Sequence, residues 1–593
     1  MRDSLNMNRD LFLSDLALPD IIVAPRTDPI YNAHGYLTKV PVDAITPYIS
    51  AFTEPGEVVV DMFAGSGMTA IAARIAGRSA TVSDISALGR HIGQGYLTEV
   101  PSSDFRLFAT KVIQGARTQL GELYLTQRST DGASVEFVRT IWSFVYQCAA
   151  CSADIIYYEA MASNEWAVPT RCPHCQSPFQ KRGAVHIRDI PVRVVVDGED
   201  KKQLEQPVVE VDFRRISVAE ERTDLSRVPN VRITADREMY KRSALGKWGL
   251  DDTRQFFSAR NALALYYVWT EIQSVDDTDI RQKLLFAFTA ILPRASRRYQ
   301  WSHQRPLNAA TQNYYIAPVY FEWNVFELFD RKVDAARRSD AEIAARSNKA
   351  STPTTQNYVI ASAASLTHLR DASVDYVFTD PPFGSNLFYA DMNLFQEAWL
   401  DRRTDDAEEA VIHTNGKRGE DAALRYEDLL GRALAEAHRI LKPGRHLSLV
   451  FGNSSGRVWS MVQRMLRVSG FDSRPVHIGI LDKGQRSVKG LNSGSENVST
   501  LDLVLTVRKS DTEVPFFTEY TSNRISIAEI IDETLGSIDV RSLPTASHVY
   551  LTILKHAFAL GLDVESLNLS DVLAALQTKG LEANAKSGML EVA

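Results

Sequence analysis

EVVVDMFAGSGMTAIAARIAGRSATVSDIS, residues 57–86, joins two buried-strand patterns through one helix pattern and decides the fold class. The first β-branched run ends at a turn that contains Gly65 and Gly67. The helix-forming stretch after the turn ends at Gly77, and the second strand pattern ends on Asp84. This order of strand, turn, helix and strand predicts the opening unit of a doubly wound α/β sheet.

The glycine turn has the features of a nucleotide-binding site. Gly65 and Gly67 let the backbone turn tightly and approach a ligand closely. Asp84 follows about twenty residues later, where an acid can hold ribose hydroxyls. No Gly-Lys-Ser/Thr sequence follows the turn, so it is not a P-loop, and the dinucleotide fingerprint is incomplete. The pattern favours an adenosine-containing ligand without a long phosphate chain, with glycines that serve packing alone as the alternative.

A further buried-strand pattern, DYVFTD (375–380), ends on Asp380 and is followed by Pro381, Pro382 and Phe383. Proline cannot donate to a sheet ladder, so the two prolines should end the strand and stiffen the turn that follows. The chain thus places a carboxylate and an aromatic ring on a rigid turn directly after a strand. A stiffened strand end with a surface acid is the structural alternative.

FAGSG (63–67) and DPPF (380–383) together resemble the signatures of the amino-group DNA methyltransferases that use S-adenosylmethionine. The segment 34–61 is similar to that family's methionine-binding motif, in which a Lys and a Pro precede a helix and a Pro-Gly turn. The resemblance covers roughly 34–100 and 358–508 and implies a Rossmann-like methyltransferase sheet. It implies catalytic roles for Asp380, Pro381, Pro382 and Phe383, and cofactor-binding roles for Lys39, Asp61, Phe63, Ala64, Gly65, Ser66, Gly67, Asp84 and Ser362.

The chain departs from the family's pattern at two places. Ser362 stands where the family usually has an acid near the cofactor adenine, and Phe383 replaces the commoner Tyr. Phe383 keeps the stacking face and loses the hydroxyl. We expect Asn386, Tyr389 and Asp391, which follow the DPPF turn, to line the target-base pocket; alternatively, Tyr389 and Asp391 begin a helix.

The chemistry of amine methylation gives the DPPF turn a meaning of its own. The lone pair of an exocyclic amine is delocalised into the base, so the nitrogen is a poor nucleophile. Two acceptors at its two N–H bonds draw it toward a tetrahedral geometry, and the Asp380 carboxylate and the Pro381 carbonyl are the obvious pair. The prolines fix the direction of that carbonyl, and Phe383 offers a face for an extruded base.

All four cysteines fall within a short stretch, as Cys148, Cys151, Cys172 and Cys175. Two C-x2-C pairs separated by 20 residues predict a zinc ribbon, in which four thiolates surround one structural Zn²⁺. His174 lies inside the second pair but is not needed as a ligand. Two disulfides or free thiols are the alternatives. The ribbon either holds DNA or a partner, or only fastens the segment in which it lies.

The order of the patterns predicts a sheet domain split by a large insertion. We expect residues 1–100 and 351–510 to be the two halves of the methyltransferase domain. Residues 101–350 should form an insertion with the ribbon at about 140–190 and a helical target-recognition region, and residues 511–593 a helical C-terminal appendage. Individual expectations are helices over 253–275, 278–292, 320–347 and 425–444, the last capped by Gly444, and closing strands over 474–481 and 500–508.

The composition is that of an ordinary soluble protein. The 593 residues are 45% hydrophobic and 23% charged, with a net charge of −7, and no apolar run approaches the ~20 residues of a membrane helix. The N-terminus lacks the basic-then-apolar order of a signal peptide, so we expect a cytoplasmic location. DNA binding then requires a local basic patch. A mixed basic and aromatic group in the insertion suits this role: Arg294, Arg297, Arg298, Trp301, His303 and Arg305.

These features predict a DNA methyltransferase that moves a methyl group from S-adenosylmethionine to an exocyclic amine of a flipped base in duplex DNA. Adenine N6 is favoured over cytosine N4, because cytosine enzymes of the family more often carry Ser in place of Asp380. An RNA methyltransferase acting on guanine N2 or adenine N6, and an inactive DNA-binding or assembly subunit, are the alternatives. A partner protein from a restriction or defence system is compatible with this hypothesis.

Overall fold

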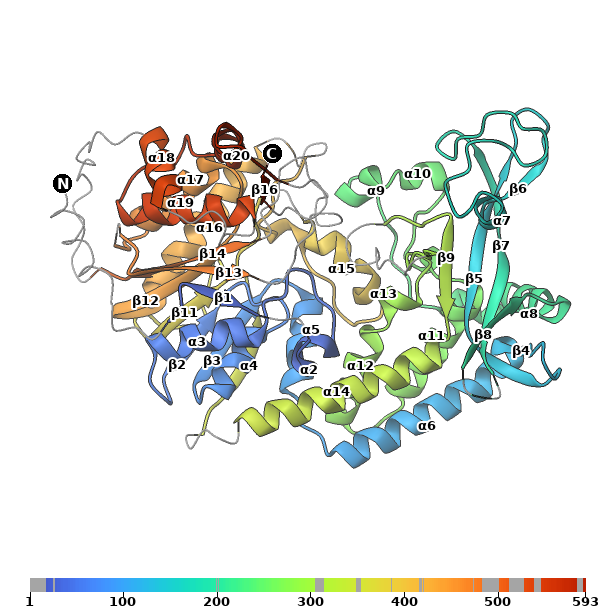
Figure 1. Cartoon of the computed structure of the whole chain (residues 1–593). Coiled ribbons are helices and arrows are strands. Elements are labelled where there is room, and N and C mark those ends of the chain that lie inside the picture. The colour runs from blue at the N-terminus through green and yellow to red at the C-terminus, as the bar shows by residue number, and fades with distance from the viewer. Residues whose placement is uncertain are drawn as a thin grey trace. The chain divides into compact units, whose positions relative to one another are not determined.

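The computed structural model describes residues 18–24, 27–198, 200, 202–303, 314–347, 353–384, 387–414, 419, 421–472, 474–482, 501–510, 527–537, 545–583 and 590–592. Arg305 and Asn386, considered above for nucleic-acid contacts, lie outside these residues. The chain divides into two compact units (Figure 1). The first comprises residues 1–97, 338–390 and 404–593, and the second comprises residues 98–337 and 391–403.

The first unit contains an eight-stranded sheet of order β1-β13-β14-β12-β11-β2-β3-β10. Its strands are β1 (Ile21–Val23), β2 (Val58–Asp61), β3 (Ser79–Asp84), β10 (Gln356–Ile360), β11 (Val374–Thr379), β12 (Leu441–Phe451), β13 (His477–Asp482) and β14 (Asp502–Arg508). Strands β10, β3, β2, β11 and β12 are parallel neighbours, and β14 runs antiparallel between β12 and β13. The closing pair of strands predicted from the sequence is thus present.

The centre of this sheet joins strands from two distant parts of the sequence. β2 pairs with β11, with Val59 opposite Tyr376 and Val60 opposite Val377. From β2 the chain proceeds to β3 on one side, whereas from β11 it proceeds to β12 on the other. Loops that leave adjacent parallel strands in opposite directions open a crevice at the carboxyl ends, which is the usual ligand site of such sheets. In this sheet the two strands end at Asp61 and Thr379.

Helices cover both faces of the sheet (Figure 1). On one face, α3 (Val42–Phe52) packs Tyr48 on Phe378 and Phe52 on Tyr376, with ring centroids 5.7 and 5.5 Å apart. On the other face, Val377 and other strand residues share a core with α16 (Ala422–Ile440) and α17 (Gly456–Val468). Burial on both faces explains why the strands read as continuous apolar runs. The other helices among the described residues before the second unit are α2 (Pro29–Ala33), α4 (Met68–Ile75) and α5 (Ala87–Leu97).

The C-terminal region forms helices as expected, but it belongs to the core of the first unit and is not a peripheral appendage. Its elements are α18 (Ile527–Ser537), α19 (Ala546–Ala559), α20 (Leu569–Thr578), β15 (Leu581–Ala583) and β16 (Leu590–Val592). Buried residues of all three helices share one apolar cluster with the strands, and Phe558 packs edge-on against Trp459 of α17. The start of α17 is also tied to this region, since Gly456 N donates to Asn568 Oδ1 (3.1 Å).

The second unit contains a sheet that the sequence analysis missed. Its order is β4-β5-β7-β8, with β6 and β9 also paired to β5: β4 (Leu125–Gln127), β5 (Ser134–Gln147), β6 (Asp154–Ile156), β7 (Val185–Asp197), β8 (Gln203–Pro207) and β9 (Val319–Trp323). Its helices include α6 (Ser102–Leu120), α7 (Tyr157–Ala162), α8 (Glu210–Glu220), α9 (Glu238–Arg242), α10 (Leu245–Trp248), α11 (Ala259–Gln273), α12 (Thr278–Thr289) and α13 (Leu292–Ala295). None of the described helices combines the length and apolar character needed to cross a membrane.

Two predicted elements need correction. The helix expected over 320–347 begins only with α14 (Val325–Ser347), because its first residues form β9. A short aromatic run cannot be assigned to helix or strand by periodicity alone. Gly444 does not cap α16, which ends at Ile440. It lies within β12 with a φ of +72°. A helix that spans both units, α15 (Tyr389–Glu397), follows the DPPF turn.

Gly456→Ala tests whether the C-terminal helices belong to this core. A Cβ at this position would lie 2.1 Å from the carbonyl oxygen of Val564, so the two segments would have to separate. We expect the free energy of unfolding to fall by about 1–3 kcal/mol, the usual cost of overpacking. The measurement is the urea-unfolding midpoint.

Gly431→Ala is the matched control, because the nearest atom to its added Cβ is Met465 Sδ at 3.9 Å, in the interior of α16. This change should be neutral or stabilising by up to about 1 kcal/mol. Equal midpoints for the two variants would contradict the packing of the C-terminal helices on α17.

Candidate functional site

The glycine turn is closed by Asp61 at the end of β2. One carboxylate oxygen accepts from Phe63 N (3.0 Å) and the other from Thr69 Oγ1 of α4 (2.6 Å). Burial raises the pKa of Asp61 to about 6, although these hydrogen bonds oppose the shift. Gly65 and Gly67 both have positive φ values, +48° and +78°, which explains the choice of glycine at these positions. Asp61 therefore holds the turn in shape and is itself only 4% exposed.

Asp84 braces the same turn from the neighbouring strand. Its Oδ2 accepts from Gly65 N (2.8 Å) and its Oδ1 from Ser86 N (2.9 Å). Burial raises the pKa of this carboxyl, and the backbone N–H groups of Ser86 and Gly65 lower it. A carboxylate has about four lone-pair sites, so Asp84 retains acceptor capacity for the hydroxyls of a ligand.

Three residues that the sequence analysis did not single out support the turn. Tyr358 of β10 donates its hydroxyl hydrogen to Gly65 O (2.6 Å). It reaches this atom because α5 carries glycine at two positions on one helix face: a Cβ on Gly93 would lie 2.4 Å from the Tyr358 ring, and one on Gly89 would lie 2.5 Å from Gly65 O. In the sequence, the two glycines four residues apart in α5 were the feature that could have indicated a close contact on this helix face.

The two motif turns meet at the carboxyl ends of β2 and β11. Thr379 Oγ1, at the end of β11, donates to Asp61 Oδ1 (2.9 Å). Asp380 follows directly. Tyr389, whose hydroxyl contacts Thr38 Oγ1 (3.0 Å), has its pKa raised by burial and further by the charges of Asp380, Glu409 and Asp84. The Thr379–Asp61 hydrogen bond therefore joins the ends of the two strands that lead into the motif turns.

The DPPF turn is held from α16 and β12. Tyr426 donates its hydroxyl hydrogen to Pro382 O (2.8 Å), which fixes the turn next to Pro381. The ring of Phe383 packs on Phe451 with centroids 4.9 Å apart. Gly452 leaves room for this ring, because a Cβ there would lie 3.3 Å from Phe383 Cε2. The turn is thus rigid for reasons beyond its two prolines.

Lys39 is buried, and its ammonium group is used by the protein. It donates to Tyr31 O (2.7 Å), His34 O (3.0 Å) and Tyr96 OH (3.0 Å). An ammonium has three N–H bonds, so these contacts account for its donors. The geometry therefore makes Lys39 a support for the segment before α3, and direct contact with a cofactor remains only a prediction. Ala64 and Ser66 are buried within the glycine turn, with Phe63 half-buried beside them.

Two further candidates have protein partners of their own. Ser362 donates to Glu408 Oε2 (3.1 Å) and accepts from Ala364 N (3.3 Å). Asp391, considered for the base pocket, is 5% exposed and accepts from Arg237 Nη1 (2.7 Å) and Met239 N (3.0 Å) in the second unit. These contacts favour a structural role for Asp391.

The basic and aromatic group of the second unit is largely internal. Arg297 pairs with Asp189 and lies over the Tyr320 ring, and Arg298 is 1% exposed against Phe395. Arg294 donates to Tyr299 OH (2.8 Å). The sequence suggested that these guanidinium groups contact phosphates, but in the structure they contact other groups of the protein. Trp301 and the exposed His303 instead form an aromatic group with Trp166, whose ring stacks on His303 at 4.5 Å.

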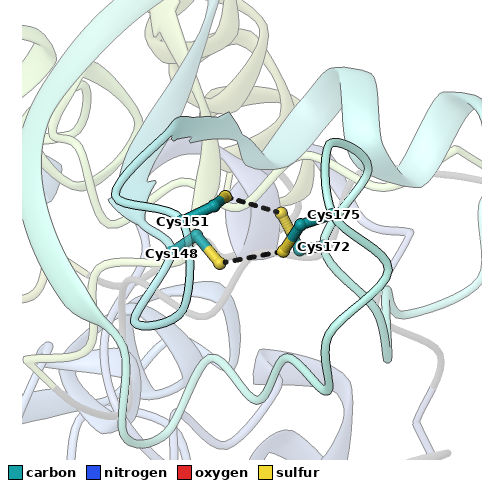
Figure 2. A group of neighbouring side chains, drawn as sticks. All are labelled: Cys148, Cys151, Cys172 and Cys175. Carbon is teal, nitrogen blue, oxygen red and sulfur yellow. Dashed lines mark hydrogen bonds between the residues drawn. The ribbon is translucent and has the colours of Figure 1, made fainter.

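The four cysteine sulfurs converge in the second unit, from two loops that face each other (Figure 2). Cys148 Sγ lies 3.7 Å from Cys175 Sγ, Cys151 Sγ lies 3.9 Å from Cys172 Sγ, and all four sulfurs are within 4.8 Å of one another. A tetrahedron with Zn–S bonds of about 2.3 Å has edges of about 3.8 Å. The sulfur spacing therefore fits Zn²⁺. His174 Nε2 contacts Asp154 O instead (3.0 Å).

The two cysteine loops have the same backbone pattern. In each loop the N–H of the first cysteine donates to the carbonyl five residues later, Ala153 or Ser177 (2.9 Å each). The fourth residue after each first cysteine returns a hydrogen bond to it and has a positive φ, 59° at Ser152 and 61° at Gln176. Backbone N–H groups of Cys151 and Ala150 lower the pKa of Cys148. Each loop is thus shaped to offer two sulfurs on one side.

Comparisons with known proteins gave two similar solved structures and one family match. Two crystal structures of a candidate DNA modification methylase from Thermus thermophilus are similar at 16% and 15% identity, with TM-scores of 0.15 and 0.16. Each match covers 32% of this chain and 72% of the other. No curated protein sequence matches the chain. Residues 23–99, however, match the DNA methylase family N6_N4_Mtase, which confirms over this segment the family resemblance that the motifs predicted.

Proposed function

We propose that the chain is an S-adenosylmethionine-dependent DNA methyltransferase that modifies an exocyclic amine, with adenine N6 as the favoured target. The hydrogen bond between Thr379 and Asp61 is the observation that carries the proposal. It fastens the end of the DPPF strand, β11, to the end of the glycine-turn strand, β2. These two strands are the parallel neighbours from which the chain proceeds in opposite directions along the sheet. A target amine at one turn and a methyl donor at the other would then be neighbours.

The described residues have complementary roles in this reaction. When bound, S-adenosylmethionine supplies an electrophilic methyl group on its sulfonium. The glycine turn and Asp84 would hold its adenosyl part, and Asp61 would keep that turn in place. Asp380 and the Pro381 carbonyl would accept hydrogen bonds from the two N–H groups of the target amine and orient its lone pair toward the methyl group. Because Tyr426 and Phe451 already fix the DPPF turn, little reorganisation would accompany the reaction.

We further propose that Cys148, Cys151, Cys172 and Cys175 hold one structural Zn²⁺, in the manner of a zinc ribbon. The close approach of the four sulfurs and the matching backbone of the two loops support this ligand set. With four thiolates the coordination sphere is full, so no position is left for a catalytic water. The metal would stabilise the end of β5, where the first loop begins.

Asp380→Ala tests the catalytic role. The variant should lose methyl transfer to duplex DNA, because the amine loses an acceptor, while its dissociation constant for S-adenosylmethionine stays near that of the native chain. The measurements are transfer of labelled methyl groups and calorimetric cofactor binding. Asp371→Ala, an exposed acid of the same unit that pairs with Arg439, is the control and should retain transfer. Loss of cofactor binding in Asp380→Ala would mean that the residue has been misplaced. Transfer by the native chain to tRNA or rRNA, without transfer to DNA, would favour an RNA methyltransferase.

Asp84→Ala tests the cofactor role. Its removal should weaken S-adenosylmethionine binding by about 1.5–3 kcal/mol, the range of hydrogen bonds to a charged group. Part of this loss would come from the released N–H of Gly65. An unchanged dissociation constant rejects the assignment.

Metal analysis tests the ribbon. The purified chain should contain one zinc per molecule, and Cys172→Ser should lose it, because a hydroxyl does not replace a thiolate at Zn²⁺. His174→Ala is the matched control within the same loop and should keep its metal, since His174 contacts Asp154 O. Native chain without zinc would rule out the ribbon.

A further inference from the structure

A cavity of about 390 Å³ lies within the second unit. Its lining residues come from the adjacent strands β5, β7 and β9, from α8, from the start of α11 and from the segment after α13. They belong to neither the motif turns nor the cysteine loops. Arg188 and Glu220 line the cavity and are exposed, so it opens to the surface. The volume falls within the roughly 300–1,000 Å³ that is usual for small-molecule sites.

The buried carboxylate of Glu322 in the cavity wall is already saturated. It accepts hydrogen bonds from Trp142 Nε1 (2.8 Å) and from Ser258 Oγ. It also accepts two from Arg260, which is 2% exposed and balances its charge. These four donors match the roughly four lone-pair sites of a carboxylate, so Glu322 has no acceptor capacity left for a ligand.

The second acid in the wall, Asp189, is engaged in a similar way. It accepts from Arg297 Nη2 and from Tyr320 OH (2.7 Å), and His186 Nε2 lies 2.7 Å from its other carboxylate oxygen. Arg297 balances the charge of Asp189, and the two exposed residues at the rim carry opposite charges. The cavity therefore has no excess of negative charge.

Hydrogen-bond donors, by contrast, remain available at the start of α11. The helix begins at Ala259, and the Ser258 side chain accepts from Asn261 N (3.2 Å). The N–H groups of Ala259 and Arg260 have no partner within the helix, because the first four N–H groups of an α-helix lack one. Both residues line the cavity. They also lie at the positive end of the helix dipole, which favours anions.

Arg297 adds an independent indication of a missing partner. Its Nη2 donates to Asp189 and its Nη1 to Gln255 O (3.1 Å). Its Nε is buried and has no hydrogen-bond partner among the described residues, and Arg297 lines the cavity. A buried donor without a partner costs free energy, because it has lost its hydration without compensation. An acceptor on a ligand would remove this cost.

Unused donors beside saturated acceptors favour a ligand rich in acceptor oxygens, and a phosphate group has them. A phosphate alone is small for a cavity of about 390 Å³. The wall also contains the rings of Trp142, Phe257 and Tyr320, which suit the flat face of a nucleobase.

We propose that this cavity binds the phosphate group of a nucleotide, with the N–H groups at the start of α11 and Arg297 Nε as donors. The site is additional to the proposed cofactor site and does not depend on the proposed reaction. A free nucleotide and a nucleotide within a DNA strand offer the same phosphate chemistry, and the experiment separates these two sources.

Ala259→Pro removes one of the donors and little else. Proline is favoured at the first position of a helix, and Ser258 already has the extended conformation that precedes a proline (φ −67°, ψ 158°). The measurement is calorimetry on the full chain with thymidine 5′-monophosphate, in the presence of saturating S-adenosylhomocysteine to occupy the proposed cofactor site. The variant should bind the monophosphate roughly 10- to 150-fold more weakly than the native chain, because a hydrogen bond to a charged group is lost. Thymidine, which has no phosphate, should bind weakly to both chains and show no such difference.

Thr278→Pro is the matched control, because it changes the first residue of α12 in the same unit and should keep the native affinity. Both variants should unfold at the urea concentration of the native chain. Affinity for duplex DNA identifies the source of the phosphate. A DNA affinity that falls in Ala259→Pro but not in Thr278→Pro indicates a nucleotide of the strand, whereas an unchanged DNA affinity with weakened monophosphate binding indicates a free nucleotide. No binding of the monophosphate by the native chain, or native affinity in Ala259→Pro, overturns the proposal and leaves the proposed methyltransferase function intact.

Discussion

A buried carboxylate at the end of the central strand holds the candidate site together. Asp61 receives hydrogen bonds from the glycine turn, from the first helix after it and from Thr379 at the end of the DPPF strand. A group with so little exposure is stable there only because these donors compensate for lost hydration. The two turns are thus fixed by one residue that need not touch a ligand. The positions of the two turns relative to each other are therefore set by the sheet, and the loops follow from them.

The sequence predicted the parts of the site that depend on local chemistry. Glycines with positive φ at 65 and 67, the proline-stiffened turn at 380–383 and the paired cysteines each carry their geometry in a few consecutive residues. The contacts of Tyr358 and Glu408 could not be predicted in this way, because each joins segments that are distant in the chain and depends on strand order. Lys39 shows the opposite case. The resemblance assigns this lysine to a ligand, but its ammonium group donates to backbone carbonyls of α2 and of the residue after it.

The fold was predictable to a similar degree. The strand patterns of the first unit are those of strands buried on both faces, and they gave the correct elements before and after the second unit's residues 98–337. The sheet of the second unit was missed because its two long strands flank the cysteine loops and mix apolar with charged residues. The C-terminal helices looked peripheral for a related reason. Their apolar faces are matched only by α17 and the sheet, which no local pattern reveals.

The position of β2 also has a consequence for biosynthesis. Its partner β11 follows residues 98–337 of the second unit in the chain, so a ribosome releases β2 and β3 long before the centre of the sheet can be completed. Until then the open side of β2 is an unpaired edge with apolar faces, which is a template for wrong pairing. Residues 98–337 of the second unit emerge in one stretch before β11, whereas residues 391–403 of that unit emerge after it. Production of the chain at high rates should therefore favour aggregates that chaperones or slow translation relieve.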